Sequence, residues 1–148
     1  MAIEREGDGV RLDLRPEERA LLRQVAGELE ALLAGQPDDP SLRRLFPPAH
    51  EDDALEQEYR ELTRPQLDDG RRRALETLGE TADAGRLTAE EADAWLRVLN
   101  DARLVLGTRL DITEDYDWDE LERDPRAPEL AVYAYLSWIQ EQLVEALA

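Results

Sequence analysis

The chain has 148 residues, of which 36 are acidic and 18 basic, so its formal net charge is −18. All 18 basic residues are Arg, and the sequence holds one His, no Lys and no Cys. These absences exclude disulfides, cysteine-ligated zinc, thiol nucleophiles, lysine Schiff bases and P-loop chemistry. With 42% hydrophobic residues, a chain of this length can bury one core, and we predict a single domain over residues 1–148.

The apolar composition favours helix, because 25 Leu and 19 Ala stand against 6 Val and 3 Ile. We therefore predict a mainly α fold, a single-domain helical bundle of about five helices with a short N-terminal β-hairpin. No stretch approaches the roughly 20 apolar residues that cross a bilayer, and the N-terminus lacks a basic segment followed by an apolar run. A cytoplasmic protein that does not enter membranes is expected.

Residues 2–14 show the pattern of a hairpin. Gly7-Asp8-Gly9 provides the turn, and Val10, Leu12 and Leu14 alternate with polar residues at the period of a half-buried strand. Since an isolated hairpin is marginal in water, this face is expected to lie against the helical bundle of residues 16–147.

Helix boundaries follow from local signals. Pro16 starts a first helix that Gly35 ends, and Pro65 is predicted to separate a second helix from a third. Thr88 and Glu91 form a capping box, the strongest local signal in the chain, for a helix that ends between Gly107 and Leu110.

An acidic loop is predicted over residues 111–129, with nine acidic residues against two Arg. The last helix follows, from about Pro128 to Leu147. Because it is apolar nearly all round between Leu130 and Ile139, we expect it to be central to the core.

Two segments carry side chains that could bind a metal ion. A calcium-loop frame starting at Asp111 fails because Tyr116 stands where a glycine is needed. The other, His50 with Asp52, Asp53 and Glu56, is better explained as the acidic start of a helix. We expect no metal, no cofactor and no catalytic residue, and hence no enzyme, although a carboxylate or metal-dependent enzyme stays an alternative.

Arginines cluster at Arg71, Arg72 and Arg73, where they could contact phosphates. The competing interpretation, which we favour, is exposed arginines paired with acids at helical spacing, such as Asp69. Residues 1–74 have a net charge of −6 and residues 75–148 of −12, so any contact with nucleic acid would be made by the first half.

The aromatic residues allow two interpretations as well. They could line a ligand pocket, but aromatic residues at helical spacing are more often core, and we favour core. The residues are Trp95, Trp118, Trp138, Tyr133 and Tyr135.

Three segments together resemble an actinobacterial family of unknown function, whose genes tend to lie beside that of the Clp protease adaptor. They are the Arg44-Leu45-Phe46-Pro47-Pro48-Ala49-His50 run with Glu58-Tyr59-Arg60, the stretch from Trp95 to Leu110, and Val132-Tyr133 to Glu141. The resemblance implies a link to the actinomycete oxidative-stress transcription regulator, which senses redox state through a cysteine pair. This chain has no cysteine, so thiol sensing does not transfer.

From the residues and the resemblance together we predict a non-catalytic regulatory protein that acts by protein–protein contact. Its partner would be a protein with a basic surface, with RNA polymerase or a sigma factor as first candidates, and a homodimer stays open. The predicted partner-binding residues are Glu114, Asp115, Asp117, Asp119 and Glu120. The alternative is direct DNA binding through Arg71, Arg72 and Arg73, on a side that also carries Arg60 and Arg64.

Overall fold

The computed structural model describes residues 2–35, 39–45 and 53–148, and the side chains of these residues except 53, 56 and 59–68. Within these ranges the chain forms four α-helices, two short 3-10 helices and three short strands. The predicted class, mainly α with an N-terminal hairpin, is confirmed. No helix in the described ranges combines the length and apolar character needed to cross a membrane.

Strands β1 (Ile3–Glu6) and β2 (Gly9–Leu12) pair antiparallel, as expected. Gly7 makes the turn with a φ of 62°, a backbone conformation that suits glycine. The alternating residues Val10, Leu12 and Leu14 are all buried, which confirms the predicted inward face.

A third strand, β3 (Arg86–Leu87), pairs with the other side of β2 and was not predicted. Two residues are too few to show the alternation by which a strand is recognised in a sequence. The close approach of β3 explains Gly9, because a Cβ at that position would lie 2.2 Å from the Leu87 carbonyl oxygen.

The helices begin and end close to the local signals. Their bounds are α1 (Pro16–Gly35), α2 (Asp53–Thr81), α3 (Ala89–Arg109) and α4 (Ala127–Leu147), with the 3-10 helices η1 (Pro40–Leu42) and η2 (Trp118–Arg123). At the start of α3 the capping box is complete. The Thr88 hydroxyl accepts from the Glu91 N–H at 3.1 Å, and the Glu91 carboxylate accepts from the Thr88 N–H at 2.8 Å.

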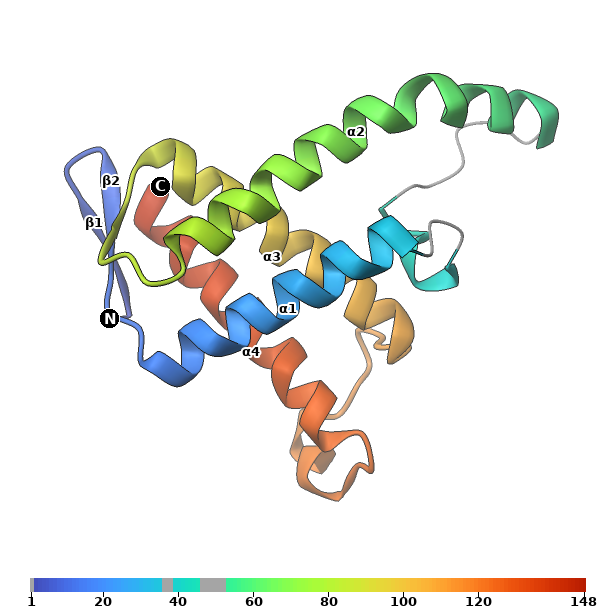
Figure 1. The fold of residues 1–148 in the computed structure, drawn as a ribbon. Coiled ribbons are helices and arrows are strands. Elements are labelled where there is room, and N and C mark those ends of the chain that lie inside the picture. The colour runs from blue at the N-terminus through green and yellow to red at the C-terminus, as the bar shows by residue number, and fades with distance from the viewer. Residues whose placement is uncertain (1, 36–38, 46–52) are drawn as a thin grey trace.

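The predicted boundary at Pro65 is wrong, because α2 runs through it as one helix. A proline inside a helix removes one hydrogen bond and crowds the preceding turn, which bends a helix without necessarily ending it. Figure 1 shows α2 changing direction toward its N-terminal end, where it extends beyond the other helices.

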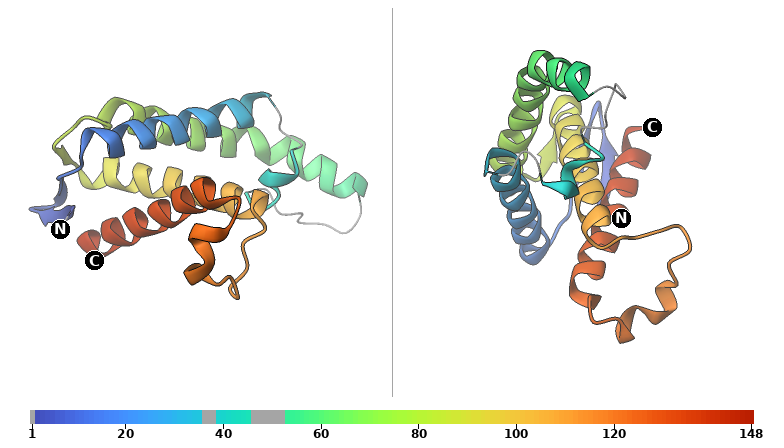
Figure 2. Two further views of the ribbon diagram at one scale, coloured as in Figure 1. Left: turned by 90° about the horizontal axis from the view of Figure 1, so that it is seen from below. Right: turned by 90° about the vertical axis from the view of Figure 1, so that its right-hand side faces the viewer.

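Helix α3 is the centre of the arrangement. It packs against α2 on one side and α4 on the other, and it also contacts α1, η1 and strands β2 and β3 (Figure 2). The sheet lies at one end of the helices, close to the C-terminal end of α4 (Figure 1). Helix α4 is also central to the core, as expected, because its inner face contributes the fully buried Leu130, Leu136, Ile139 and Leu143. Its apolar character all round does not mean that it is buried all round. One of its faces stays open, with Trp138 and Val144 among the exposed apolar residues.

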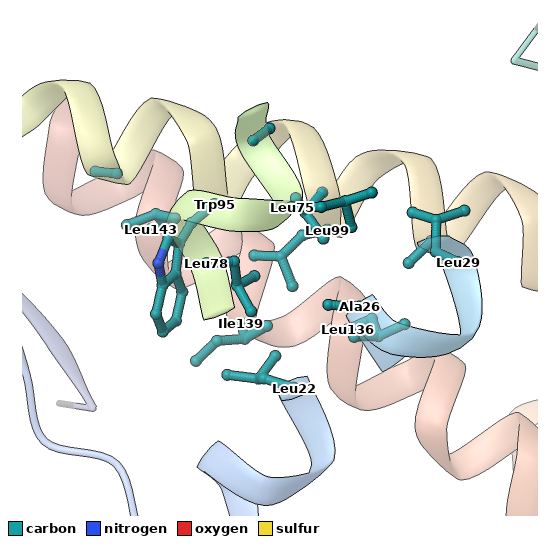
Figure 3. Packing of buried hydrophobic residues seen from close by; sticks show 14 of the residues in the cluster. Leu22, Ala26, Leu29, Leu75, Leu78, Trp95, Leu99, Leu136, Ile139 and Leu143 are labelled. Atoms are coloured by element: carbon teal, nitrogen blue, oxygen red, sulfur yellow. The ribbon is translucent and has the colours of Figure 1, made fainter. Parts of the chain in front are cut away.

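Trp95 of α3 lies in the core and is fully buried. Leucines and isoleucine from α1, α2 and α4 surround it and its neighbour Leu99 (Figure 3). Its indole N–H donates to the Thr81 hydroxyl at 2.7 Å, and that hydroxyl donates to the Thr77 carbonyl at 2.6 Å. The polar edge of the largest core side chain is thus satisfied by the last turn of α2.

Candidate functional site

Two surfaces follow from the sequence, the arginines of α2 and the acidic segment before α4. Arg71 belongs to the first but lies mostly inside the fold. Its Nε donates to Asp101 of α3 at 3.0 Å, the two side chains are 15% and 14% exposed, and a second nitrogen donates to the Leu45 carbonyl at 3.3 Å. Burial raises the pKa of Asp101, while Arg71 and Arg97 lower it. Arg71 thus joins α2 to α3.

Arg72 and Arg73 face solvent. Arg72 forms an ion pair with Asp69 one turn earlier, at 2.6 Å, as the favoured interpretation of this cluster expected. The side chains of Arg60 and Arg64 lie outside the described residues. Of the described side chains on this part of α2, Arg72 and Arg73 would meet an approaching phosphate, and Arg72 already has the Asp69 carboxylate beside it.

The second surface is the acidic segment, defined here as residues 111–126. It projects from the body of the molecule at the N-terminal end of α4 (Figures 1 and 2). The expected loop contains the 3-10 helix η2, which begins after Asp117, whose carboxylate accepts from the Asp119 N–H at 3.0 Å. The five predicted partner-binding carboxylates, Glu114, Asp115, Asp117, Asp119 and Glu120, are all exposed.

An arginine clamp closes the acidic segment. The guanidinium of Arg126 donates to the Leu110 carbonyl at the end of α3 and to both carboxylate oxygens of Asp124, at 3.1 and 3.0 Å. Asp124 also accepts from the Arg126 N–H at 2.8 Å and from the Tyr116 hydroxyl at 3.1 Å. These donors, the Arg126 side chain first, lower the pKa of Asp124 to about 2.

Aromatic rings attach the acidic segment to α4. Tyr116 meets Trp118 edge to face with ring centroids 4.8 Å apart, and Trp118 stacks on Tyr133 of α4 at 6.1 Å with an interplanar angle of 7°. Such geometries are the favoured ones for aromatic pairs. Clamp and rings together hold the acidic segment in one position, although most of its side chains are exposed.

An open groove lies between the acidic segment and α4, with a volume of about 770 Å³. The rings of Trp118, Tyr133 and Trp138 line it together with Arg44, Glu114 and Glu141. Trp118 and Trp138 are 41% and 42% exposed. The core prediction is confirmed for Trp95 and wrong for Trp118 and Trp138, because the described part of the chain leaves about two fifths of each of these two side chains uncovered.

A pocket lined by these aromatic residues is the interpretation that we did not favour from the sequence, although one signal supported it. The buried residues Leu136, Ile139 and Leu143 follow the helical period, and Trp138, two positions after Leu136, falls about 200° around the helix from it. An aromatic residue off the buried stripe indicates a surface site, but only the fold shows that Trp118 lies near it.

The two candidate metal sites, which the sequence already disfavours, differ in how much of them the structure describes. His50 and Asp52 lie outside the described residues. Across the ranges that are described, acidic loop included, no three His, Asp or Glu side chains are grouped so as to hold a metal ion. In the rejected calcium frame, Asp111 has a φ of 51°, and the aromatic side chain of Tyr116 stands near the clamp.

A second cavity, of about 260 Å³, opens between α1, α3 and α4. Its apolar lining includes Val25, Val105, Val132 and Leu136. Arg109, Glu28 and Glu129 line it as well. The nearby Arg109 guanidinium donates to the Ser41 hydroxyl at 3.3 Å.

These features define a small, mainly helical protein whose distinctive surface is acidic and aromatic. The chain belongs to the family described as Domain of unknown function (DUF2017), which matches residues 1–147. The predicted family resemblance is thereby confirmed. No solved structure matches the chain.

Several relatives are named as regulators. The chain is 31% identical to the oxidative stress regulator AosR of Mycobacterium tuberculosis over 97% of its own length and 84% of that protein. It is 34% identical to the putative oxidative stress regulator AosR of Mycobacterium leprae, over 95% of its own length and 83% of that protein. The alignment with the Mycobacterium tuberculosis protein spans 183 positions, which is more than the 148 residues of this chain. The mycobacterial protein therefore has segments without a counterpart here.

Proposed function

We propose that this chain is a non-catalytic regulatory protein of the oxidative stress response, which acts by binding another protein through its acidic segment. The names of the mycobacterial relatives support the regulatory role. The observation that carries the mode of action is the acidic segment itself. A cluster of exposed carboxylates is held in place by the clamp of Arg126 and Asp124 and by the stacking of Trp118 on Tyr133.

Such a surface suits a basic protein. Exposed charges at an interface accelerate and orient association with an oppositely charged surface, and a fixed segment loses little conformational freedom on binding. Because this chain has no cysteine, its regulation does not depend on its own thiols. The partners to test first are RNA polymerase and its sigma factors.

The test measures, by biolayer interferometry, the binding of the purified chain to RNA polymerase core and to separate sigma factors. The variant replaces five carboxylates of the acidic segment, those of Glu114, Asp115, Asp117, Asp119 and Glu120, by amides. Its control replaces five exposed carboxylates elsewhere: Glu17, Glu30, Glu76, Glu80 and Asp93. We expect the first variant to bind at least about tenfold more weakly and the control to keep most of the affinity. Equal losses would show that net charge alone matters, and no binding to any of these proteins would refute this choice of partners.

Direct DNA binding through α2 is the alternative. The exposed Arg72 and Arg73 could contact a phosphate backbone, but Arg71 is engaged with Asp101. DNA from the region upstream of the gene is titrated across a salt series with the wild type and with an Arg72→Ala/Arg73→Ala variant, which leaves the Arg71 contact intact. Salt-dependent binding that the variant loses would establish this alternative and replace contact with a protein as the mode of action.

A further inference from the structure

The groove between the acidic segment and α4 has the build of a binding site. Its walls include two indoles that each expose about two fifths of their surface, Trp118 at 41% and Trp138 at 42%. Large aromatic side chains with one exposed face are typical of the centres of protein interfaces, where they supply contact area at little cost in conformational entropy. Among the side chains that the structure describes, the other exposed large apolar ones are Leu55 and Val144, which lie outside this groove.

The aromatic wall is fixed before any partner arrives. Trp118 stacks on Tyr133, and the Tyr133 ring lies so close to α3 that a Cβ at Gly107 would be 3.3 Å from it. Arg44 lies against the same glycine, at 3.4 Å from the same point. Trp138 packs against Tyr135 on its own helix, with ring centroids 6.0 Å apart. A preorganised wall loses little freedom on binding, so more of the contact energy contributes to affinity.

Charge indicates what kind of side chain fits. Glu114 lines the groove from the acidic segment and Glu141 from α4, against the single guanidinium of Arg44. No ion pair of either glutamate is found within the described ranges. The exposed Asp115, Asp117 and other carboxylates of the acidic segment add to the negative potential. A cation near these rings can contact an aromatic face and a carboxylate together.

We propose that this groove binds a segment of a partner protein in which an arginine or lysine stands next to an apolar side chain. The apolar side chain packs against Trp138 and Trp118, and the basic group lies over an indole face and pairs with Glu141 or Glu114. This inference rests on the proposed function, since it states which partner chemistry the acidic surface recognises.

Other occupants fit less well. A second copy of the chain would carry its own net charge of −18 toward these carboxylates. Nucleic acid could stack bases on the indoles, but its phosphates would be repelled by Glu114, Glu141 and the acidic segment. The experiments below would detect either of these two occupants.

The test is selection from a phage-displayed library of random peptides on the immobilised full chain. We expect the selected sequences to share an arginine or lysine within one or two positions of an aromatic or aliphatic residue. A selected peptide, made synthetically, is then titrated against the chain by fluorescence anisotropy. Selection of acidic sequences, or the absence of any enriched sequence, would overturn the proposal.

Four variants locate the bound peptide. Trp138→Ser removes one exposed ring of the groove and Glu141→Gln removes one of its carboxylates. Their matched controls on the same helix are Val144→Ser and Glu145→Gln, both at exposed positions outside the groove. We expect Trp138→Ser to weaken binding at least about tenfold and Glu141→Gln about threefold, with a smaller salt dependence, and the controls to bind as the wild type does. Unchanged binding by Trp138→Ser overturns the proposal, provided its circular dichroism and melting curve remain those of a folded protein.

Two further measurements separate the alternatives. A wild-type dimer that becomes monomeric in Trp138→Ser, seen by light scattering, would make a second copy the occupant. Tighter binding of a single-stranded oligonucleotide than of the peptide, lost in the same variant, would make it nucleic acid. RNA polymerase or sigma binding that survives Trp138→Ser leaves the proposed function standing and refutes the groove. If the peptide binds in a way that depends on Trp138 but neither RNA polymerase nor a sigma factor binds, the groove stands as a binding site and the proposed choice of partners is refuted.

Discussion

Arg19 of α1 joins three parts of the fold by itself. Its guanidinium donates to the carbonyls of Ala82 and Ala84, at 2.8 and 2.7 Å, after the end of α2, and to the Leu14 carbonyl at 3.2 Å before α1. We predict that Arg19→Met lowers the free energy of unfolding by about 2–3 kcal/mol, because hydrogen bonds from a charged donor are lost and buried carbonyls stay unpaired.

The matched control is Arg23→Met, one turn further along α1. Arg23 forms an ion pair with Asp83 in which the two side chains are 43% and 76% exposed. An exposed pair of this kind contributes less than about 1 kcal/mol. Urea unfolding of both variants checks the prediction, and similar losses in the two would contradict it.

The hydrogen bond between Trp95 and Thr81 is the second test at the scale of single residues. Thr81→Val keeps the shape of the side chain but leaves the buried indole N–H without its partner, so we predict a loss of about 1–3 kcal/mol. Trp95→Phe removes the N–H as well. Because the penalty of the unpaired group then disappears, the double variant is expected to lose less than the sum of the two single variants. Strict additivity in denaturant unfolding would argue against the bond.

The hydrogen bonds of the clamp at Asp124 predict that the stability of the fold depends on pH in the acidic range. A carboxyl group whose pKa is lower in the folded than in the unfolded chain stabilises the fold above its unfolded pKa of 3.8. That contribution is lost as pH falls from about 4 to about 2. Carboxyl NMR titration is expected to give a midpoint near 2 for Asp124 and a higher one in Arg126→Gln. The control Arg123→Gln, whose partner is Glu120, should leave the midpoint unchanged. A midpoint that Arg126→Gln does not move would contradict the clamp.

At the scale of elements, the glycines of the helices and the sheet have opposite roles. Gly27 in α1 and Gly79 in α2 have open space where a Cβ would be, whereas a Cβ at Gly9 would collide with the carbonyl of β3. We predict that Gly27→Ala and Gly79→Ala each raise the free energy of unfolding by about 0.5–1 kcal/mol, because alanine restricts the unfolded chain and favours helix. Gly9→Ala should destabilise the protein. Thermal melts of the three variants test these predictions. Stabilisation by Gly9→Ala would show that β3 does not lie as close to Gly9 as the structure places it.

The elements also show where sequence reasoning succeeds. The start of α1 at Pro16 and the capping box at Thr88 were predicted correctly because they depend on interactions within one helical turn. The boundary at Pro65 failed for a related reason. Proline weakens a helix locally, but whether the helix continues depends on the rest of α2 and on its packing against α3, which a local signal does not contain.

At the scale of the whole molecule, the excess of negative charge is expected to influence the stability of the fold. With a net charge of −18, mutual repulsion among carboxylates opposes the compact state, and dissolved ions screen it. We predict that raising sodium chloride from low to moderate concentration increases the melting temperature. The effect should shrink in the variant with five amides in the acidic segment. A midpoint that stays constant or falls with salt would show that attractive ion pairs outweigh the repulsion.

The sequence by itself determined the mainly helical class, the hairpin, the acidic segment and the excluded chemistries. These follow from composition and from contacts between residues close in the chain. Only the tertiary structure decided that Arg71 joins α2 to α3 at Asp101, that Trp118 stacks on Tyr133, and that Trp138 stays exposed. Whether a side chain is buried or free depends on which distant element packs over it. That is set by the joint packing of all the helices, and no local pattern records it.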